Sequence, residues 1–456
     1  MGLGRLSLPL LIVGCASGVL AKTGPLPRAQ SQVLFNNSKQ GSFTESYRGI
    51  SRSGADFEAA VLSEISRAKS SVRVAVQELS LPRVARALAA KKRQGVDVRV
   101  VLENNYDVAY SRLSADELAA LPAYSLGKYS EFLLLADAMG DKNGTASPRE
   151  QLAVDAIEIL RTAGVPTIND TADGSKGSGL MHHKFIVIDG ATTVVTSANF
   201  STSDFFGDFG NRASRGNSNA YLSFESEELA RLFVEEFEIM WGNGSPGSSR
   251  FGINKPYRTA RRIALKDSSV VSVQFSPQSK RLRWNDSPNG LIARTLSTAR
   301  HSIDFALFAF SEQRLADVMD RPGVRVRGLV EPTFAYRDYS ELLDLMGVEM
   351  LNDKCVFERG NRPWRTPAAE VGSPRLADGD KLHHKYAVID GKTTVFGSHN
   401  WSEAANSIND ETLLIIESAS IGSKFSEELD RLMERSVLGV QPWLLKQIRS
   451  LENACR

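Results

Sequence analysis

Two residue types that build covalent or metal-held frameworks are scarce in this sequence. Its 456 residues include 3 cysteines and 6 histidines. So few cysteines exclude the disulfide-dense class of small secreted domains. Away from the amino terminus only Cys355 and Cys455 remain. They could form one bridge in an oxidising compartment, but we expect them to be unpaired.

A large net charge is also missing. The 55 lysines and arginines and the 53 aspartates and glutamates nearly cancel, leaving a formal charge of +2. The field of the whole protein therefore does not predict a polyanionic partner, and it does not choose between substrate classes. Hydrophobic residues at 42% and charged residues at 24% are typical of a globular protein rather than a disordered one.

The apolar run at the amino terminus is too short to cross a bilayer. It extends from Leu6 to Val13 and follows Arg5, whereas a membrane span needs about 20 apolar residues. This layout predicts an export signal over residues 1–21.

Two interpretations of this signal stay open. Cys15 ends a sequence that resembles a bacterial lipobox, whose cysteine becomes lipid-modified and would give peripheral membrane association; alternatively, cleavage follows Ala21. In both cases we expect an exported protein, as a cell-envelope lipoprotein or in secreted or periplasmic form. We expect residues 22–54 to be an extended linker.

The chain contains an internal repeat. A segment from Ala68 to Val100 matches a segment from Ala299 to Arg327, and both copies have the pattern helix, strand, helix, strand. This alternation predicts a parallel or mixed sheet with helices on both faces, so each half should form one α/β lobe. The expected elements cover residues 57–68, 72–76, 84–92 and 96–102 in the first copy and 291–299, 303–310, 314–319 and 324–330 in the second.

Composition and spacing give the boundaries of the lobes. A stretch rich in glycine, serine and asparagine separates the copies near residue 250. His182 follows Ser71 by 111 residues, whereas His383 follows Ser302 by 81, so the first lobe carries 30 extra residues. They fall within about residues 103–178, a helix-rich, polar stretch to which the sequence assigns no role. The expected division is a first lobe over 55–242, an inter-lobe linker over 243–258, a second lobe over 259–440, and a C-terminal helix or tail over 441–456.

Each half carries the same polar motif at identical spacing. On a strand, side chains two residues apart share a face, so the first histidine and the lysine point the same way while the second histidine points the opposite way. The next four residues are apolar, as in a strand buried on both faces, so the site should lie at a strand end. The motif residues are His182, His183, Lys184, Asp189, Ser197 and Asn199 in the first half and His383, His384, Lys385, Asp390, Ser398 and Asn400 in the second.

These residue types suit the chemistry of a phosphodiester. Its phosphorus is shielded by negative oxygens, which the lysines would neutralise and the asparagines and serines would hydrogen-bond. A neutral imidazole can attack phosphorus, and a second, protonated imidazole can give its proton to the leaving alkoxide. The pair predicts a covalent phosphohistidine that water or an alcohol resolves.

Two other roles are possible for the histidines. Metal binding is disfavoured because neighbouring side chains on a strand face apart, and because the set lacks the carboxylates and cysteines usual in zinc sites. A merely structural role is disfavoured because the whole motif is duplicated. We therefore expect neither a metal nor another cofactor.

The motifs resemble those of the phospholipase D superfamily, H-x-K-x4-D followed by G-S-x-N, usually twice per chain. The similarity extends from about residue 55 to 435. It implies two similar lobes, each a mixed β-sheet flanked by helices, related by a pseudo-two-fold axis, with both motifs lining one cleft and no metal required. It also implies that Asp189 and Asp390 support the motif rather than react.

Two departures from the family pattern concern the site. Thr196 replaces the usual glycine, which Gly397 supplies in the second lobe. Family members place an acidic residue downstream to hold a histidine ring, and aligning the strands puts Glu411 opposite Asn219. A carboxylate raises the basicity of a histidine more than an amide does, so we expect the two histidines to differ in role. Glu411 is expected in the catalytic set and Asn219, with Ser197 and Ser398, against substrate. The nucleophile stays open between His182 and His383, although the resemblance favours His182.

Two further features are given structural interpretations. Asn219 follows Asn199 by 20 residues and Glu411 follows Asn400 by 11, and this nine-residue excess contains three phenylalanines, at 205, 206 and 209. We expect them to pack a long loop, although contact with acyl chains or bases is an alternative. The basic runs at 91–93 and 258–262 are expected to be solvated faces.

The sequence favours a lipid phosphodiesterase that releases a headgroup alcohol and leaves phosphatidate. The alternative is a nonspecific endonuclease acting on DNA or RNA with the same two histidines, and phosphatidyl transfer or an inactive binding scaffold is less favoured. The expected substrate is thus a phospholipid or nucleic-acid phosphodiester. No obligate protein partner is implied.

Overall fold

The computed structural model describes residues 1–2, 30–177, 179–245 and 247–456. The expected signal segment, with Cys15, lies outside the described residues. Among the residues described, none of the helices combines the length and apolar character needed to span a bilayer.

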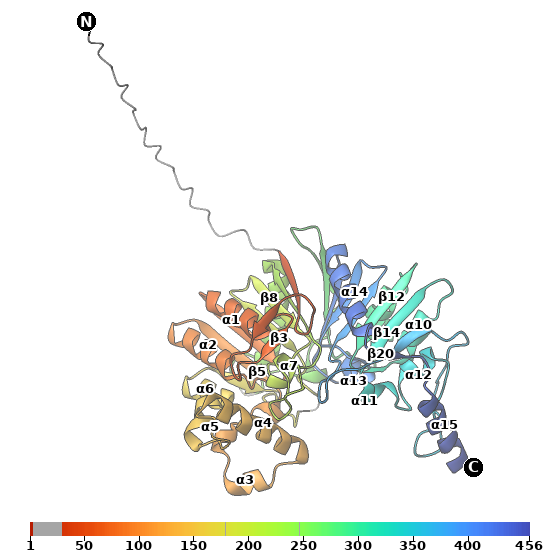
Figure 1. The fold of residues 1–456 in the computed structure, drawn as a ribbon, viewed down its shortest axis with the longest axis horizontal. Coiled ribbons are helices and arrows are strands. Elements are labelled where there is room, and N and C mark those ends of the chain that lie inside the picture. The colour runs from red at the N-terminus through yellow and green to blue at the C-terminus, as the bar shows by residue number, and fades with distance from the viewer. Residues whose placement is uncertain (3–29, 178, 246) are drawn as a thin grey trace.

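Each half of the chain folds into a mixed sheet with helices on its faces, and the two lobes stand side by side (Figure 1). The first sheet has the strand order β1 (Ser31–Phe35), β9 (Ala220–Glu225), β8 (Thr192–Thr196), β7 (Lys184–Ile188), β4 (Ser71–Val76), β5 (Asp97–Leu102) and β6 (Thr167–Asn169). The second has the order β10 (Arg261–Ala264), β11 (Val270–Phe275), β19 (Thr412–Glu417), β17 (Thr393–Gly397), β16 (Lys385–Ile389), β12 (Ser302–Leu307), β14 (Arg325–Val330), β15 (Glu370–Pro374) and β20 (Ser436–Leu438).

The register confirms the repeat. In both lobes the first two repeat strands pair in parallel, β4 with β5 and β12 with β14. The strand that follows each histidine pairs antiparallel with the first of these, β7 with β4 and β16 with β12. The motif strands therefore occupy the middle of each sheet, which explains why residues 185–188 and 386–389 are apolar and buried.

Helices cover both sheets, and local sequence signals start them. Asp56 caps α1 by accepting from the backbone N of Ala59, and Pro82 occupies the first turn of α2, where no intrahelical N–H is needed. The helices of the first lobe are α1 (Phe57–Arg67), α2 (Pro82–Arg93), α3 (Ala115–Ala119), α4 (Ala123–Met139), α5 (Pro148–Val154), α6 (Ala156–Thr162), α7 (Thr202–Phe205) and α8 (Glu227–Trp241). Those of the second are α9 (Pro288–Leu296), α10 (Gln313–Met319), α11 (Pro332–Ala335), α12 (Glu341–Leu345), α13 (Glu403–Ser407), α14 (Ala419–Met433) and α15 (Pro442–Ala454).

One hydrophobic core joins the lobes. It contains Phe233 of α8 and Phe425 of α14 together with residues of both sheets. Phe35 of β1 packs edge-on against Phe425 at 5.1 Å between ring centroids, and Phe275 of β11 packs against Phe233 at 5.2 Å. Each lobe thus contributes an outer strand to the helix of the other, which holds the two sheets in a fixed relation.

The extra residues of the first lobe fold into helices, as expected. The segment that contains them, about residues 103–178, includes α3 to α6, with α3 and α4 at the lower edge of the first lobe in Figure 1. Phe205, Phe206 and Phe209 are buried in the core of this lobe, so they pack the loop as predicted.

Three expectations need correction. Residues 31–53 are not an extended linker, because β1 pairs with β9 and β2 (Ser42–Thr44) pairs with β3 (Ser51–Ser53). Cys355 and Cys455 form a disulfide across 100 residues of sequence, because α15 returns to the loop that carries Cys355. Arg258 is half-buried rather than fully solvated, because its guanidinium pairs with buried Glu236 and lies 5.0 Å from the ring centroid of Phe275, whereas Arg261 and Arg262 are exposed as expected.

Candidate active site

The two histidine motifs meet where the chains of the two lobes cross. The backbone N of His182 donates to the carbonyl of Asp410 in the second lobe at 2.9 Å. The backbone N of His383 donates to the carbonyl of Ser218 in the first lobe at 3.0 Å. Each motif is therefore attached to the strand entrance of the opposite lobe, and the two motifs form one site.

The ring of His182 is held by a carboxylate from the other lobe. Its Nδ1 lies 2.7 Å from Oε2 of Glu411, and the hydroxyl of Ser398 donates to the same oxygen at 2.6 Å. Glu411 is fully buried, so its carboxylate acts on the ring with little screening by water. Burial, followed by the charges of Lys184 and Lys385, holds the pKa of His182 well below its usual value. The imidazole is thus neutral at pH 7, with Nδ1–H donating to Glu411 and Nε2 carrying the lone pair.

The ring of His383 is held in the same way by an amide. Its Nδ1 lies 3.0 Å from Oδ1 of Asn219, to which the hydroxyl of Ser197 donates at 2.8 Å. Burial, followed by the charges of Lys385 and Lys184, also lowers the pKa of His383 well below its usual value. The two histidines therefore differ in their hydrogen-bond partners, because His182 contacts a carboxylate and His383 contacts an amide.

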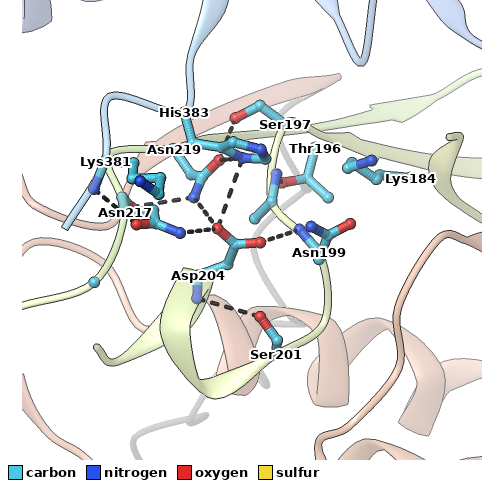
Figure 2. A network of polar contacts seen from close by, with 12 residues as sticks. Lys184, Thr196, Ser197, Asn199, Ser201, Asp204, Asn217, Asn219, Lys381 and His383 are labelled. Atoms are coloured by element: carbon cyan, nitrogen blue, oxygen red, sulfur yellow. Dashed lines mark hydrogen bonds and ion pairs between the residues drawn. The ribbon is translucent and has the colours of Figure 1, made fainter. Parts of the chain in front are cut away.

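A carboxylate that the sequence did not reveal stands behind that amide. Oδ1 of Asp204 lies 3.6 Å from Nδ1 of His383 and accepts from the side-chain amides of Asn217 at 2.7 Å and Asn219 at 3.2 Å (Figure 2). Its Oδ2 accepts from the backbone N of Asn199 at 2.7 Å. Asp204 belongs to α7, within the nine-residue excess of the first lobe. The presence of an aspartate among the nine additional residues between Asn199 and Asn219 is the sequence signal that could have identified Asp204 as a partner of His383.

The two motif lysines enter the site from opposite lobes and find different neighbours. Nζ of Lys184 donates to the carbonyl of His182 at 2.9 Å and to Oε1 of Gln77 at 3.2 Å. Nζ of Lys385 donates to the carbonyl of His383 at 2.8 Å and lies 4.7 Å from the ring centroid of Phe308.

Both lysines are buried cations that an anionic ligand would stabilise. Burial lowers the pKa of Lys184 to about 8, against the opposing charges of Glu411, Asp204 and Glu78. Burial and then the charge of Lys184 lower the pKa of Lys385 well below its usual value. A phosphate group between the two lysines would offset this repulsion.

The motif asparagines retain hydrogen-bonding capacity. Within the described part of the chain, the buried Oδ1 atoms of Asn199 and Asn400 have no hydrogen-bond partner. Both side-chain amides follow the strand that neighbours the histidine strand, β8 in one lobe and β17 in the other. Contact of these two side chains with a ligand stays a prediction.

The serines and Asn219 have contacts other than the expected contact with substrate. Ser197 accepts from the backbone N of Ala220 at 3.0 Å while it donates to Asn219. Ser398 likewise accepts from the backbone N of Thr412 at 2.9 Å while it donates to Glu411. These hydroxyls orient the groups that hold the histidines, so we assign all three residues a positioning role.

The glycine position before each serine differs between the lobes. Gly397 has φ +152°, and a Cβ there would lie 2.0 Å from the carbonyl oxygen of Thr412. Thr196 is accommodated in the first lobe, where its hydroxyl donates to the carbonyl of Ala220 and accepts from the backbone N of Ala198, both at 2.9 Å. Thr196 in place of glycine therefore does not displace Ser197.

The motif aspartates lie at the far end of the histidine strands. The carboxylate of Asp189 accepts from the backbone N of Lys69, Ser70 and Ser71 at 2.7–2.8 Å. Asp390 makes the same contacts with the backbone of residues 300–302. Both aspartates adopt left-handed backbone conformations, φ +52° and +51°, which asparagine and aspartate tolerate better than most residues. They support the fold and do not reach the histidines.

The second histidine of each pair points away from the site. His183 bonds Glu236 at 3.0 Å, and His384 bonds Glu428 at 3.2 Å, in both cases on the helix that covers the other face of the sheet. In the described residues, no group of three or more histidine, cysteine, aspartate or glutamate side chains is arranged to hold a metal ion.

Comparisons with known proteins agree with this geometry. The family model described as "Cardiolipin synthase, PLD-like domain" matches residues 61–241 and 292–433, more than half of the chain. The mitochondrial cardiolipin hydrolases of Mus musculus and Homo sapiens are 28% and 29% identical over 158 and 149 residues, which cover 34% and 32% of this chain.

The alignment with these relatives covers only part of their length, whereas one solved structure aligns over nearly the whole of both chains. The aligned region spans 61% of the mouse protein and 50% of the human one. The crystal structure of phosphatidylserine synthase from Haemophilus influenzae Rd KW20 aligns with a TM-score of 0.51 at 12% identity, covering 93% of both chains, and this likeness shows the two-lobed fold. With two family-model segments and two intact histidine motifs in one site, the chain belongs to the phospholipase D superfamily.

Proposed function

We propose that the protein hydrolyses phospholipids to phosphatidate and a free headgroup alcohol, through a phosphohistidine formed on His182. The observation that carries the proposal is the unequal support of the two rings. His182 contacts the Glu411 carboxylate, whereas His383 contacts the Asn219 amide. A carboxylate partner makes an imidazole a better nucleophile, and an amide partner leaves the other ring more acidic.

The first half-reaction forms the covalent intermediate. Nε2 of His182 attacks phosphorus and forms an N–P bond while the P–O bond to the headgroup alcohol breaks. Lys184 and Lys385 stabilise the charge on the equatorial oxygens. Protonated His383 gives its Nε2 proton to the leaving alkoxide. The bound diester brings a negative charge next to the lysines, which favours this protonated form of His383 over the neutral form of the empty site.

The second half-reaction reverses these roles. A water molecule attacks phosphorus from the side that the alcohol left, and neutral His383 takes its proton. The N–P bond breaks and returns the electron pair to Nε2 of His182. Phosphatidate is then bound to an enzyme whose His383 is again protonated, so no co-reactant other than water is needed.

A lipid substrate is supported by the wall of the site beside His383. The ring of Phe308 contacts the His383 ring at 4.9 Å between centroids, and Phe334 contacts Phe308 at the same distance. Both phenylalanines are half-buried, so each exposes part of an aromatic face next to the reacting groups. Such a wall suits the glycerol backbone and acyl chains of a phospholipid better than the charged backbone of a nucleic acid. The names of the two cardiolipin hydrolases point the same way.

The test uses the purified full chain in EDTA with phospholipid vesicles and, separately, with plasmid DNA and RNA. We expect release of the headgroup alcohol, formation of phosphatidate, and no cutting of either nucleic acid. Acid-sensitive, alkali-stable phosphorylation of the peptide that contains His182 should be trapped by rapid quenching. Nicking without headgroup release would instead support the endonuclease alternative, and His182→Ala serves as the inactive control.

A further inference from the structure

The insertion of the first lobe places a half-buried lysine against a buried carboxylate that follows strand β4. Nζ of Lys128, on α4, donates to both carboxylate oxygens of Glu78 at 2.8 Å. Glu78 is 5% exposed, and within the described part of the chain Lys128 makes no other hydrogen bond. The carboxylate thus neutralises the ammonium, and one N–H of Lys128 remains for another acceptor.

Two tyrosines complete this cluster. The hydroxyls of Tyr106 and Tyr124 lie 2.7 Å apart, and Tyr124 is 60% exposed. Nζ of Lys128 lies 5.8 Å from the centroid of each ring. The cluster therefore presents aromatic faces, two phenolic hydroxyls and one ammonium N–H at the surface of the insertion.

The cluster is connected to the reacting groups through the backbone. Glu78 follows Gln77, whose Oε1 accepts from Nζ of Lys184. The carbonyl of Glu78 accepts from the backbone N of Phe200, the residue after Asn199, at 2.9 Å. Residues 201–203, which lead into α7 and Asp204, line the same cavity as Glu78 and Lys128. The charge of Glu78 acts on Lys184 and that of Asp204 acts on Lys128, so the cluster lies within electrostatic range of the motif of the first lobe.

The second lobe has no equivalent cluster. The positions that correspond to Gln77 and Glu78 in the repeat are Phe308 and Ala309, and the insertion is present only in the first lobe. One side of the site is therefore apolar and the other carries hydrogen-bonding groups. A phosphodiester with one apolar and one polar substituent would bind in a single orientation.

We propose that Glu78, Tyr106, Tyr124 and Lys128 form a subsite for an uncharged, hydroxyl-bearing headgroup of the glycerol type. The inference rests on the proposed lipid hydrolysis and names the substrate class. A headgroup with a quaternary ammonium is disfavoured because Lys128 already occupies the cation–π position beside both rings. A second phosphate is disfavoured because Glu78 cancels the charge of Lys128. Hydroxyl groups can both donate to and accept from the remaining phenol and ammonium groups.

The test compares dihexanoyl phosphatidylglycerol with dihexanoyl phosphatidylcholine, both in solution as monomers so that binding to an interface does not contribute. We expect the full-length enzyme to have a kcat/KM at least about tenfold higher for the glycerol lipid. Tyr124→Phe should lower this ratio about fivefold by removing one hydroxyl. The paired change Glu78→Gln with Lys128→Met should lower it further without leaving a buried charge unpaired.

A matched control is available on the same helix. Tyr129 packs its ring against Tyr110 and Phe132, and Tyr129→Phe should leave the ratio unchanged. Equal rates for the two lipids in the wild type, or an equal effect of Tyr124→Phe and Tyr129→Phe on the ratio, would overturn the subsite but not the hydrolysis. If neither lipid loses its headgroup, the proposed function fails and the subsite with it.

Discussion

In the first lobe, Nδ1 of His182 is hydrogen-bonded to the carboxylate of Glu411. In the second lobe, Nδ1 of His383 is hydrogen-bonded to the side-chain amide of Asn219 and lies 3.6 Å from Oδ1 of Asp204. The two halves share the histidines and lysines expected to contact phosphate, and they differ in the side chain that orients each histidine. A symmetric pair of histidines would compete for the same step. Unequal partners assign one ring to attack and the other to proton transfer, and each prediction below tests that assignment.

The largest effect is expected from removing the histidines one at a time. With bis(p-nitrophenyl) phosphate, His182→Ala should abolish turnover because no nucleophile remains. His383→Ala should still release about one p-nitrophenol per enzyme in a rapid burst, because this leaving group needs no proton, and then turn over roughly 10²- to 10⁴-fold more slowly. Stopped-flow absorbance measures both phases. A burst with His182→Ala and none with His383→Ala would reverse the roles.

The next effect concerns the carboxylate behind His182. Glu411→Gln keeps the size of the side chain and removes its charge, and we expect kcat to fall about 10- to 100-fold because a hydrogen bond to a charged group is weakened. Asn219→Asp serves as the matched change behind the other histidine. If Glu411→Gln cost no more than Asn219→Asp, the two rings would not differ in the way proposed.

A smaller effect is expected from the displaced carboxylate. Asp204→Asn should lower kcat about tenfold, because a carboxylate near Nδ1 stabilises the protonated His383 that donates the proton. KM should change little, since Asp204 does not contact phosphate in this arrangement. With bis(p-nitrophenyl) phosphate the burst of p-nitrophenol should change little, because this leaving group needs no proton, and this result separates a positioning effect on His383 from general damage to the loop.

The smallest effect is a pH dependence from the buried lysine. Burial lowers the pKa of Lys184 to about 8, so its stabilising charge is present below that pH and is lost as the pH rises through it. We expect kcat/KM to decline above about pH 8, where this charge is lost. On the acid side kcat/KM should rise as the pH falls, because burial lowers the pKa of His383 in the free enzyme and the first step needs its protonated form. A profile that rose through pH 9 would contradict this assignment.

The sequence predicted the parts of the site that repetition makes visible. Two copies of the motif at identical spacing identified His182 and His383, and aligning the copies identified Glu411. Asp204 escaped because it lies in a segment with no counterpart in the second lobe. The alignment placed Glu411 opposite Asn219 but could not show that each holds the histidine of the other lobe, since that depends on how the lobes face each other.

The same limit applies to the fold. Alternating helices and strands predicted the centre of both sheets, where each strand is buried and its pattern is local. Strand β1 was missed because its partner is distant: Ser31 pairs with Phe224. The disulfide was missed for the same reason, because 100 residues separate Cys355 and Cys455 and nothing nearby indicates that α15 returns.

The backbone hydrogen bonds from His182 to Asp410 and from His383 to Ser218 join the two halves, so activity should require both halves to stay associated. Each half would retain its own histidine but lose the residue that orients it, so neither fragment alone has a complete reaction centre. The described residues of the loop at 243–249, which exclude residue 246, contribute no group to that centre. A protease nick there should therefore leave activity intact while the halves remain associated, and activity should then fall on dilution in proportion to the fraction that has dissociated.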